Sequence, residues 1–272
     1  MMSMTDPQPS GAFTWAQAPW GAVLQCTALL PYARHFFTDA SLQLKDRPDE
    51  WTGVANHAGV RPDNLLLLRQ AHGKTVVAAR SGRTKTWAPP AADAIISDDP
   101  SAAVVVRVAD CAPILLVDMR RGMVAAVHAG WRGTMHNIVE AAVEQMARQF
   151  STDPADLIAA IGPSLGSCCG EMGEEVVQAF RTAGHGDDDL GRWFVRAEGK
   201  RPHFDLWAAN RDQLVRAGVP LRAIHVAGLC TRTHSDVFHS YRAAGADAGR
   251  MAAVVRVPFS PRTGPLTDDE GR

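Results

Sequence analysis

The sequence has 272 residues, of which 46% are hydrophobic and 21% are charged, and its formal net charge is −1. This balance is that of a globular protein, and the length allows one large core or two modest ones. A near-neutral charge without a run of five basic residues argues against a nucleic-acid partner, and no stretch of 18 apolar residues could form a membrane-spanning helix.

The chain begins with the polar segment MMSMTDPQPSG, which lacks the basic and apolar regions of a secretory signal. Its five cysteines are too few, and odd in number, for a secreted disulfide framework, so we expect a reduced, cytoplasmic protein. Residues 1–18 and 260–272 are predicted to be loose tails. No linker or internal repeat interrupts residues 19–259, which predicts a single domain between the tails.

Three short apolar runs in the middle of the chain predict buried β-strands: AAVVVRV (102–108), PILLVDM (113–119) and MVAAV (123–127). A helix is expected to follow, with Thr134 as its N-cap. Its apolar face recurs at helical spacing and comprises Ile138, Val139, Ala142, Val143, Met146 and Phe150.

The remaining elements alternate between strand and helix. The sequence predicts strands at 156–164, 223–228 and 251–257 and helices at about 171–183 and 204–219, the second ending at Gly218. Residues 184–192, with the run HGDDD, are expected to be a solvated surface loop. Interleaved strands and helices predict an α/β fold, and strands that follow one another closely predict partly antiparallel, mixed sheets.

Three segments each place a soft metal ligand where a strand meets a turn: His72 in RQAHGKTVV, Cys111 in VADCAPILL and His128 in AAVHAGWRGT. Two imidazoles and one thiolate suit Zn²⁺ or copper, and three protein ligands leave the fourth position open, as in catalytic zinc sites. The spacing fits no zinc-finger pattern, so the residues alone leave open that these side chains belong to the core.

Six segments of the chain occur in the order of one family: RQAHGKTVV, ADCAPILL, AAVHAGWRGT, AAIGPSLGSCCGEMGEEV, DLWAANRDQLVRAGV and FHSYRAAGADAGR. They resemble the bacterial laccase-like polyphenol oxidase family, later described as purine nucleoside phosphorylases with adenosine deaminase activity and also as peptidoglycan editing factors. The resemblance covers roughly residues 30–257.

The resemblance implies zinc, or alternatively copper, on His72, Cys111 and His128, with Cys111 and His128 also acting in catalysis. It implies a single-domain α/β/β/α sandwich similar to the catalytic domain of cytotoxic necrotizing factors. The implied substrates are phosphate and purine nucleosides such as adenosine and inosine. The chain departs from the family pattern at Gly170, where a tyrosine is usual, and at Ala243, where the SYRR motif has its second arginine. The family's glycine-rich N-terminal strand motif is represented only by ARHFFTDASLQL.

Several neighbouring residues have two interpretations each. Asp110 could orient a ligand or receive a substrate proton, or it could cap a backbone N–H in a turn. Arg132, beside a helix start, could bind phosphate or form a surface salt bridge, and Arg242 could contact substrate or a partner subunit. Cys168 and Cys169 are expected to be packed thiols that bind no metal.

Three competing functions remain open. The chain could be a metal-free cysteine hydrolase or amidase acting on peptidoglycan precursors, with Cys111 as nucleophile and His128 as base. A copper-dependent polyphenol oxidase is disfavoured, because multicopper sites need many histidines and the chain has no H-x-H pair. A binding module without enzymatic activity would need a closed metal site with four protein ligands. The oligomeric state is not predicted.

Overall fold

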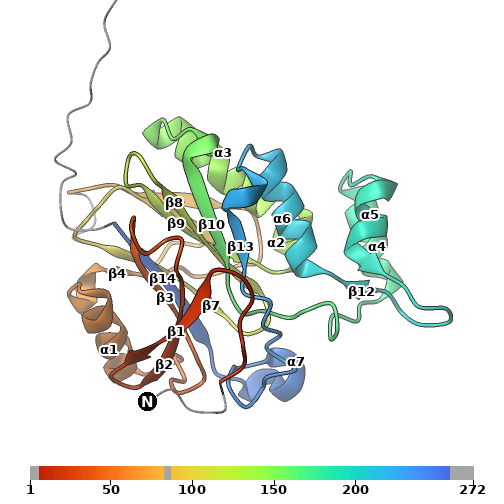
Figure 1. Ribbon diagram of the computed structural model, residues 1–272, viewed down its shortest axis with the longest axis horizontal. Helices are drawn as coiled ribbons and strands as arrows, with labels where there is room; N and C mark the ends of the chain where they lie inside the picture. The colour runs from red at the N-terminus through yellow and green to blue at the C-terminus, as the bar shows by residue number, and fades with distance from the viewer. Residues whose placement is uncertain (1–5, 83–86, 258–272) are drawn as a thin grey trace, which may run out of the picture.

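The computed structural model describes residues 6–82 and 87–257, which form two six-stranded sheets (Figure 1). The first sheet contains, in spatial order, β1 (Phe13–Ala18), β2 (Gly21–Cys26), β3 (Arg34–Thr38), β14 (Met251–Arg256), β7 (Ala103–Val108) and β4 (Leu65–Leu66). The second contains β13 (Ile224–Val226), β10 (Leu157–Ile161), β8 (Ala112–Asp118), β9 (Val124–Ala129), β6 (Ala94–Ser97) and β5 (Val76–Ala79). A separate two-stranded sheet pairs β11 (Phe194–Val195) with β12 (His203–Phe204).

Both large sheets are mixed, as the sequence predicts. In the first sheet β4 pairs with β7 in parallel, and the other neighbours are antiparallel. In the second sheet the parallel pairs are β10 with β13 and β5 with β6. Parallel pairs occupy one edge of the first sheet and both edges of the second, and all other neighbouring strands are antiparallel.

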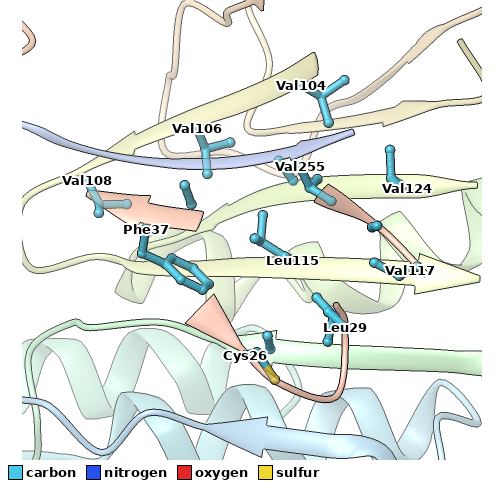
Figure 2. Packing of buried hydrophobic residues seen from close by; sticks show 14 of the residues in the cluster. Cys26, Leu29, Phe37, Val104, Val106, Val108, Leu115, Val117, Val124 and Val255 are labelled. Carbon is cyan, nitrogen blue, oxygen red and sulfur yellow. The ribbon is translucent and has the colours of Figure 1, made fainter. Parts of the chain in front are cut away.

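The two sheets face each other across the main hydrophobic core (Figure 2). Phe37 of β3 and Val106 of β7 meet Leu115 of β8 there, and all three side chains are buried. A second cluster fills the space between the second sheet and the helices α3 and α6, and a third lies between the first sheet and α1. The layers therefore run helix, sheet, sheet, helix, and burial of apolar surface between them is the main stabilising contribution.

The helices are α1 (Pro48–Ala58), α2 (Trp131–Met135), α3 (Ile138–Phe150), α4 (Glu174–Thr182), α5 (Asp187–Trp193), α6 (Leu206–Arg216) and α7 (Tyr241–Ala244). Short 3₁₀ turns occur at Pro62–Asn64, Pro154–Asp156, Leu221–Ala223 and Gly245–Asp247. None of the helices in the described part of the chain combines the length and apolar character that a membrane span needs.

The central strands agree with the sequence prediction to within a few residues, because each is an unbroken apolar, β-favouring run. Their sheet membership could not be predicted. β7 belongs to the first sheet and β8 to the second, so residues 109–111 carry the chain from one sheet to the other. This crossing sets the position of the candidate site.

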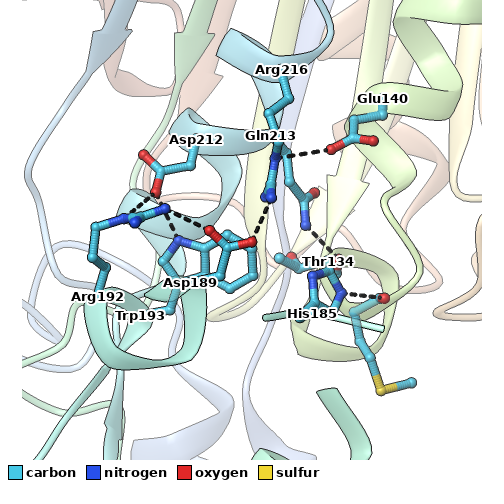
Figure 3. A network of polar contacts seen from close by, with 10 residues as sticks. Thr134, Glu140, His185, Asp189, Arg192, Trp193, Asp212, Gln213 and Arg216 are labelled. Carbon is cyan, nitrogen blue, oxygen red and sulfur yellow. Dashed lines mark hydrogen bonds and ion pairs between the residues drawn. The ribbon is translucent and has the colours of Figure 1, made fainter. Parts of the chain in front are cut away.

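The predicted N-cap of the long helix is wrong. Thr134 is buried inside the short helix α2, and the helix α3 begins after Asn137, whose φ is 59°. The Thr134 carbonyl instead accepts a hydrogen bond from the Gln213 side chain at 2.7 Å (Figure 3). Because this bond satisfies a buried carbonyl, Thr134 joins α2 to α6 rather than capping α3.

The predicted surface loop at 184–192 is also wrong, because most of it forms the helix α5. Three aspartates occupy the first turn, where negative charge is favourable. Trp193 at the end of α5 is fully buried, and its indole N–H donates to Asp212 at 2.9 Å (Figure 3). Asp189 lies between Arg192 and Arg216, which ties α5 to α6.

The N-terminal tail is shorter than expected. Residues 13–18 form β1, which pairs with β2 and buries Phe13 and Trp15 on one face. The alternation of buried and polar residues in FTWAQA is the strand signal that the proline-rich start of the chain obscures. The predicted C-terminal tail, 260–272, lies outside the described residues.

Candidate active site

A pocket of about 890 Å³ opens at the edge where β7 ends, β8 begins and β9 ends. His72, Cys111 and His128 line it, and each presents one potential ligand atom. These three atoms all lie within 4.8 Å of one another. The three side chains singled out from the sequence therefore converge in one accessible site, although 39 residues separate His72 from Cys111.

Cys111 and His128 converge because of the register of two antiparallel strands. Ala112 pairs with Ala129 and Pro113 pairs with His128, so Cys111 and His128 lie at the same edge of β8 and β9, as predicted. His128 is buried, whereas Cys111 is partly exposed at the pocket floor. The rigid sheet holds both side chains at the wall of the pocket.

The two loops that deliver the site have unusual backbone conformations. Asp110, which precedes Cys111, has φ of +83°, and His72 has φ of +59°. Residues other than glycine rarely adopt positive φ, so the surrounding contacts must hold these conformations. The His72 backbone N–H donates a hydrogen bond to the buried Asp93 carboxylate. The Asp110 carboxylate itself accepts hydrogen bonds from Thr231 and from the Arg242 backbone.

Asp93 is the carboxylate that holds His72 and His128 together, and sequence reasoning did not single it out. Its Oδ1 atom accepts hydrogen bonds from the His128 ring at Nδ1 and from the His72 backbone N–H, each at 2.9 Å. Its Oδ2 atom accepts from the Gly73 backbone N–H at 2.7 Å. A proton on Nδ1 of His128 leaves Nε2 free to bind a metal, which is the usual role of such a carboxylate.

Asp93 is only 1% exposed. Burial raises the pKa of its carboxyl, but the hydrogen bonds from His128, Gly73 and His72 outweigh burial and lower it. The acid is therefore charged and fully partnered. The available signal in the sequence was a lone aspartate at the start of the apolar run AIIS (94–97).

Cys111 and His128 form a charged pair when no metal is bound. Burial raises the pKa of Cys111, but the imidazolium of His128 and hydrogen bonds from both histidines outweigh it and lower the pKa to about 6. Burial lowers the pKa of His128, but the thiolate of Cys111 and the hydrogen bond to Asp93 raise it to about 9. The site thus stabilises a thiolate, the form of cysteine that binds metals and attacks electrophiles.

Gly130 provides the space for the Cys111 sulfur. A Cβ atom at this position would lie 2.7 Å from Cys111 Sγ and 3.4 Å from the His72 ring. The backbone of Gly130 is ordinary, with φ of −79° and ψ of 173°, so a side chain is excluded by the neighbouring sulfur alone. This explains the first glycine of HAGWRGT, Gly130.

The donor set fits a zinc or copper ion. One thiolate and two imidazoles are ligands that these metals prefer, and a buried carboxylate orients one of the imidazoles. Among the described residues no fourth His, Cys, Asp or Glu joins the group, and the fourth side faces the pocket. The arrangement has the open position that distinguishes catalytic zinc sites from structural ones.

The pocket wall is strongly cationic. Six basic side chains line it against two acidic ones, Asp46 and Asp110; the basic residues are Lys45, Arg69, Arg107, Arg132, Arg242 and Arg250. Burial and the adjacent charge of Arg250 lower the pKa of Arg107. Because neighbouring guanidinium groups repel each other, a bound anion would relieve an unfavourable interaction.

Arg132 lies inside α2, a helix of five residues, rather than before the helix that the apolar pattern predicts. Its guanidinium stacks over the Trp131 ring at 4.2 Å from the centroid. Both side chains line the pocket. The stacking holds the planar cation in place, and no carboxylate among residues 6–82 and 87–257 forms an ion pair with it.

Asp110 and Arg242 have structural contacts. The Asp110 carboxylate accepts hydrogen bonds from the Thr231 hydroxyl at 2.6 Å and from the Arg242 backbone N–H. The Arg242 guanidinium donates to the carbonyls of Cys169 and Glu171, both at 3.1 Å. Of the two interpretations of Asp110, these contacts favour the one in which it caps a backbone N–H.

Two of the three departures from the family pattern, at Gly170 and Ala243, differ in their structural effect. Gly170 has a clear local reason, because a Cβ atom there would lie 2.5 Å from the Phe204 carbonyl oxygen. Ala243 is exposed on α7, beside Arg242, and nothing in the structure explains it.

Comparison with known proteins identifies relatives over most of the chain. Residues 41–258 match the family described as multi-copper polyphenol oxidoreductase laccase. A purine nucleoside phosphorylase from Deinococcus radiodurans is 38% identical over 229 residues, which cover 80% of this chain and 83% of that protein. Adenosine deaminase RL5 from an unknown prokaryotic organism is 41% identical over 206 residues, covering 72% and 76%.

A solved structure has the same fold. The crystal structure of the hypothetical protein YfiH of Bacillus licheniformis superimposes with a TM-score of 0.78 at 25% sequence identity. The match covers 89% of this chain and 98% of that one. The mixed α/β architecture is therefore shared along nearly the whole length of both chains.

Proposed function

The chain belongs to the multi-copper polyphenol oxidoreductase laccase family, and we propose that it is a zinc-dependent purine nucleoside phosphorylase with adenosine deaminase side activity. The names of the two relatives support this assignment of substrate. The observation that carries it is one pocket in which a His72–Cys111–His128 donor set faces a cationic wall. We also propose that the protein acts in the cytoplasm, where its five free cysteines remain reduced.

The ligands of the proposed zinc ion are His72, Cys111 and His128. A zinc ion held by these three side chains would supply Lewis acidity to a substrate in the pocket. Asp93 keeps the proton of His128 on Nδ1 and so keeps Nε2 available. Gly130 keeps the space around the thiolate open.

The cationic wall is the proposed binding site for phosphate. Arg132, Arg107 and Arg250 all line the pocket that contains the ligands, and the charge of Arg250 acts on Arg107. Guanidinium groups bind phosphate oxygens through paired hydrogen bonds. Trp131 offers an aromatic surface near the same opening, against which a purine base could stack.

Two reactions share this pocket in the proposal. In phosphorolysis, a phosphate oxygen forms a bond to the ribose C1′ atom while the bond from C1′ to the purine nitrogen breaks. The purine leaves with the bonding electrons and takes up a proton, giving ribose 1-phosphate and free base. In deamination, water adds to C6 of adenosine and ammonia leaves, giving inosine. Phosphorolysis requires that water be kept from competing with phosphate in the pocket.

A metal-free cysteine hydrolase is the second candidate, and one observation favours it. Burial raises the pKa of Cys111, but the stronger effect of His128 lowers it to about 6. The side chain would therefore be a thiolate nucleophile at neutral pH. His128 is hydrogen-bonded to Asp93, which resembles the third member of a catalytic triad. Peptidoglycan precursors are the substrates that this alternative would have.

A multicopper oxidase is not proposed, despite the family's description. Among the described residues, the pocket group is the one cluster of potential ligands that contains histidine. The other cluster contains only cysteines. A laccase reaction needs several coppers held mainly by histidines, and the described chain offers no such set.

Product analysis tests the proposal. Purified zinc-loaded protein is incubated with adenosine in the presence and absence of phosphate, and the products are separated by chromatography. We expect adenine and ribose 1-phosphate only with phosphate, and a slower formation of inosine in both conditions. Turnover of neither adenosine nor inosine under any condition would exclude the proposal and direct attention to the hydrolase.

A further inference from the structure

A second cluster of metal-binding side chains lies outside the pocket lining. The sulfur atoms of Cys168, Cys169 and Cys230 all lie within 4.8 Å of one another, and those of Cys168 and Cys169 are 3.7 Å apart. The expectation that the vicinal pair is packed away is wrong, because Cys168 is exposed and Cys169 is partly exposed. Cys230 is buried behind them, 61 residues further along the chain than Cys169.

The fold brings the third thiol to the pair through two parallel strands. β10 and β13 are parallel neighbours, so their carboxyl ends lie at the same edge of the sheet. The vicinal cysteines occupy a tight turn after β10, in which the Cys169 N–H donates to the Gly166 carbonyl at 3.0 Å. Cys230 follows β13 and forms a bridge with Ser164. The sequence alone does not predict this cluster, because the pairing of β10 with β13 brings the two segments together.

Burial raises the pKa of Cys230, but hydrogen bonds from Thr233 and Gly166 outweigh it and lower the pKa to about 7, whereas burial raises the pKa of Cys168 to about 11. The Thr233 hydroxyl lies 3.5 Å from Cys168 Sγ and 3.6 Å from Cys169 Sγ. The Arg232 guanidinium lies 3.9 Å from Cys169 Sγ, which offsets negative charge on the sulfurs. One side of the cluster is open to solvent at Cys168, so an ion could enter without unfolding.

We propose that Cys168, Cys169 and Cys230 form a thiol-only site for a soft monovalent cation, Cu(I). Three sulfurs bound at about 2.3 Å around one ion are about 3.8 to 4.0 Å apart. The Cys168 and Cys169 sulfurs are 3.7 Å apart, and both lie within 4.8 Å of the Cys230 sulfur. Soft thiolate ligands select Cu(I) over ions that prefer oxygen.

The absence of a fourth donor distinguishes Cu(I) from zinc here. Among the described residues, no further His, Cys, Asp or Glu lies within 4.8 Å of all three sulfurs. Zinc in structural sites takes four protein ligands, whereas three thiolates can complete the coordination of Cu(I). The sulfurs contact a hydroxyl, of Thr233, and a guanidinium, of Arg232, and neither is a usual zinc ligand.

Copper titration of the full chain tests the proposal. All proteins carry Cys111→Ser, which removes the thiolate of the first site, and Cu(I) is delivered without oxygen in competition with a coloured Cu(I) chelator. We expect the Cys111→Ser protein to bind about one Cu(I). Adding Cys168→Ser, an exposed change that should not disturb folding, should weaken binding by more than about 100-fold, beyond the effect of an outer-shell change. Adding Cys26→Ser, at the buried cysteine outside both clusters, should leave copper binding unchanged.

Three results would overturn the proposal: no Cu(I) retained against the chelator, equal binding after Cys168→Ser, or tighter binding of Zn²⁺ than of Cu(I). Circular dichroism of each variant shows whether it is folded. X-ray absorption of the copper-loaded protein should show sulfur neighbours only, and nitrogen neighbours would contradict the assignment. Because Cys111 is absent from every protein, the outcome does not depend on the proposed nucleoside chemistry.

Discussion

The Nδ1 atom of His128 lies 2.9 Å from the Oδ1 atom of Asp93, and both side chains are buried. The same carboxylate accepts the backbone N–H groups of His72 and Gly73. One charged group therefore sets the ring orientation of one proposed ligand and the loop conformation of another. Asp93 should matter to metal binding although it is not itself a ligand.

We predict that Asp93→Asn weakens zinc binding by about 10- to 100-fold, the usual cost of losing an outer-shell carboxylate. Zinc affinity is measured by competition with a coloured chelator. Asp98→Asn is the matched control. Asp98 directly follows β6, whereas Asp93 directly precedes it, and the Asp98 carboxylate accepts a hydrogen bond from the Ser81 backbone N–H at 2.7 Å. An unchanged zinc affinity in Asp93→Asn would remove this residue from the site.

The three proposed ligands are expected to act together. Each of His72→Ala, Cys111→Ala and His128→Ala should leave the protein folded and reduce bound zinc by about tenfold or more, because two ligands hold the ion poorly. Metal analysis and circular dichroism measure the two effects, and His136→Ala, at an exposed histidine, is the control. A variant that retains stoichiometric zinc and full turnover would show that its residue is not a ligand.

Gly130→Ala is predicted to affect the site without straining the backbone. The added Cβ would approach Cys111 Sγ to 2.7 Å, so the thiolate must move, and we expect zinc affinity to fall by about tenfold or more. Gly186→Ala is a close control, because the backbone of Gly186 has similar angles, with φ of −75° and ψ of 162°. A Cβ atom at this position would have no atom within 4 Å. If both variants bind zinc like the parent protein, the packing at Gly130 does not constrain the site.

Arg132→Ala should raise the KM for phosphate by about 10- to 100-fold, which corresponds to the loss of one charge-assisted hydrogen bond. Zinc content should be unchanged, and deamination, which needs no phosphate, should suffer less. Arg148→Ala removes an exposed arginine in the last turn of α3 and serves as the control. Equal loss of both activities would instead assign Arg132 to the nucleoside or to the fold.

His35 is expected to make stability depend on pH. Its Nε2 atom accepts the Cys26 backbone N–H at 2.9 Å, so the buried ring must be neutral there. Burial lowers its pKa from 6.5 to about 4, and the unfolded chain therefore binds the proton more readily between these values. Stability contributed by the neutral ring is present above about pH 6.5 and is lost as the pH falls towards 4.

The expected loss is about 2 kcal/mol of unfolding free energy between pH 7 and pH 5. Urea unfolding of the parent protein and of His35→Gln measures it. The variant should be less stable at pH 7 and should show a weaker pH dependence, whereas the exposed change His136→Gln should follow the parent. A parent and a His35→Gln protein with the same pH dependence would contradict this assignment.

The sequence predicted those parts of the fold that are encoded in short stretches of consecutive residues. The apolar runs of β7, β8 and β9 are such parts, whereas the grouping of His72, Cys111 and His128 in one site was implied by the family resemblance. The assignment of β7 and β8 to different sheets depends on long-range pairing, which no local pattern contains. The same holds for the bond between Asp93 and His128 across two strands and for the approach of Cys230 to the vicinal cysteines.

Other errors came from weak or ambiguous signals. The acidic run at 187–189 predicted a loop, whereas those acids favour the first turn of α5 and Trp193 anchors it. The prolines at the start of the chain hid the alternation in β1. The similarity to the cytotoxic necrotizing factor domain, implied by the family resemblance, stays a prediction.

Metal removal and restoration test the central claim most directly. The protein is stripped with a chelator, and phosphate-dependent release of adenine from adenosine is measured as zinc is returned in small steps. We predict loss of activity in the stripped protein and recovery that reaches its plateau as the His72–Cys111–His128 site fills, with no recovery in Cys111→Ala. Full activity in the stripped protein would contradict the account and would support Cys111 as a metal-free nucleophile.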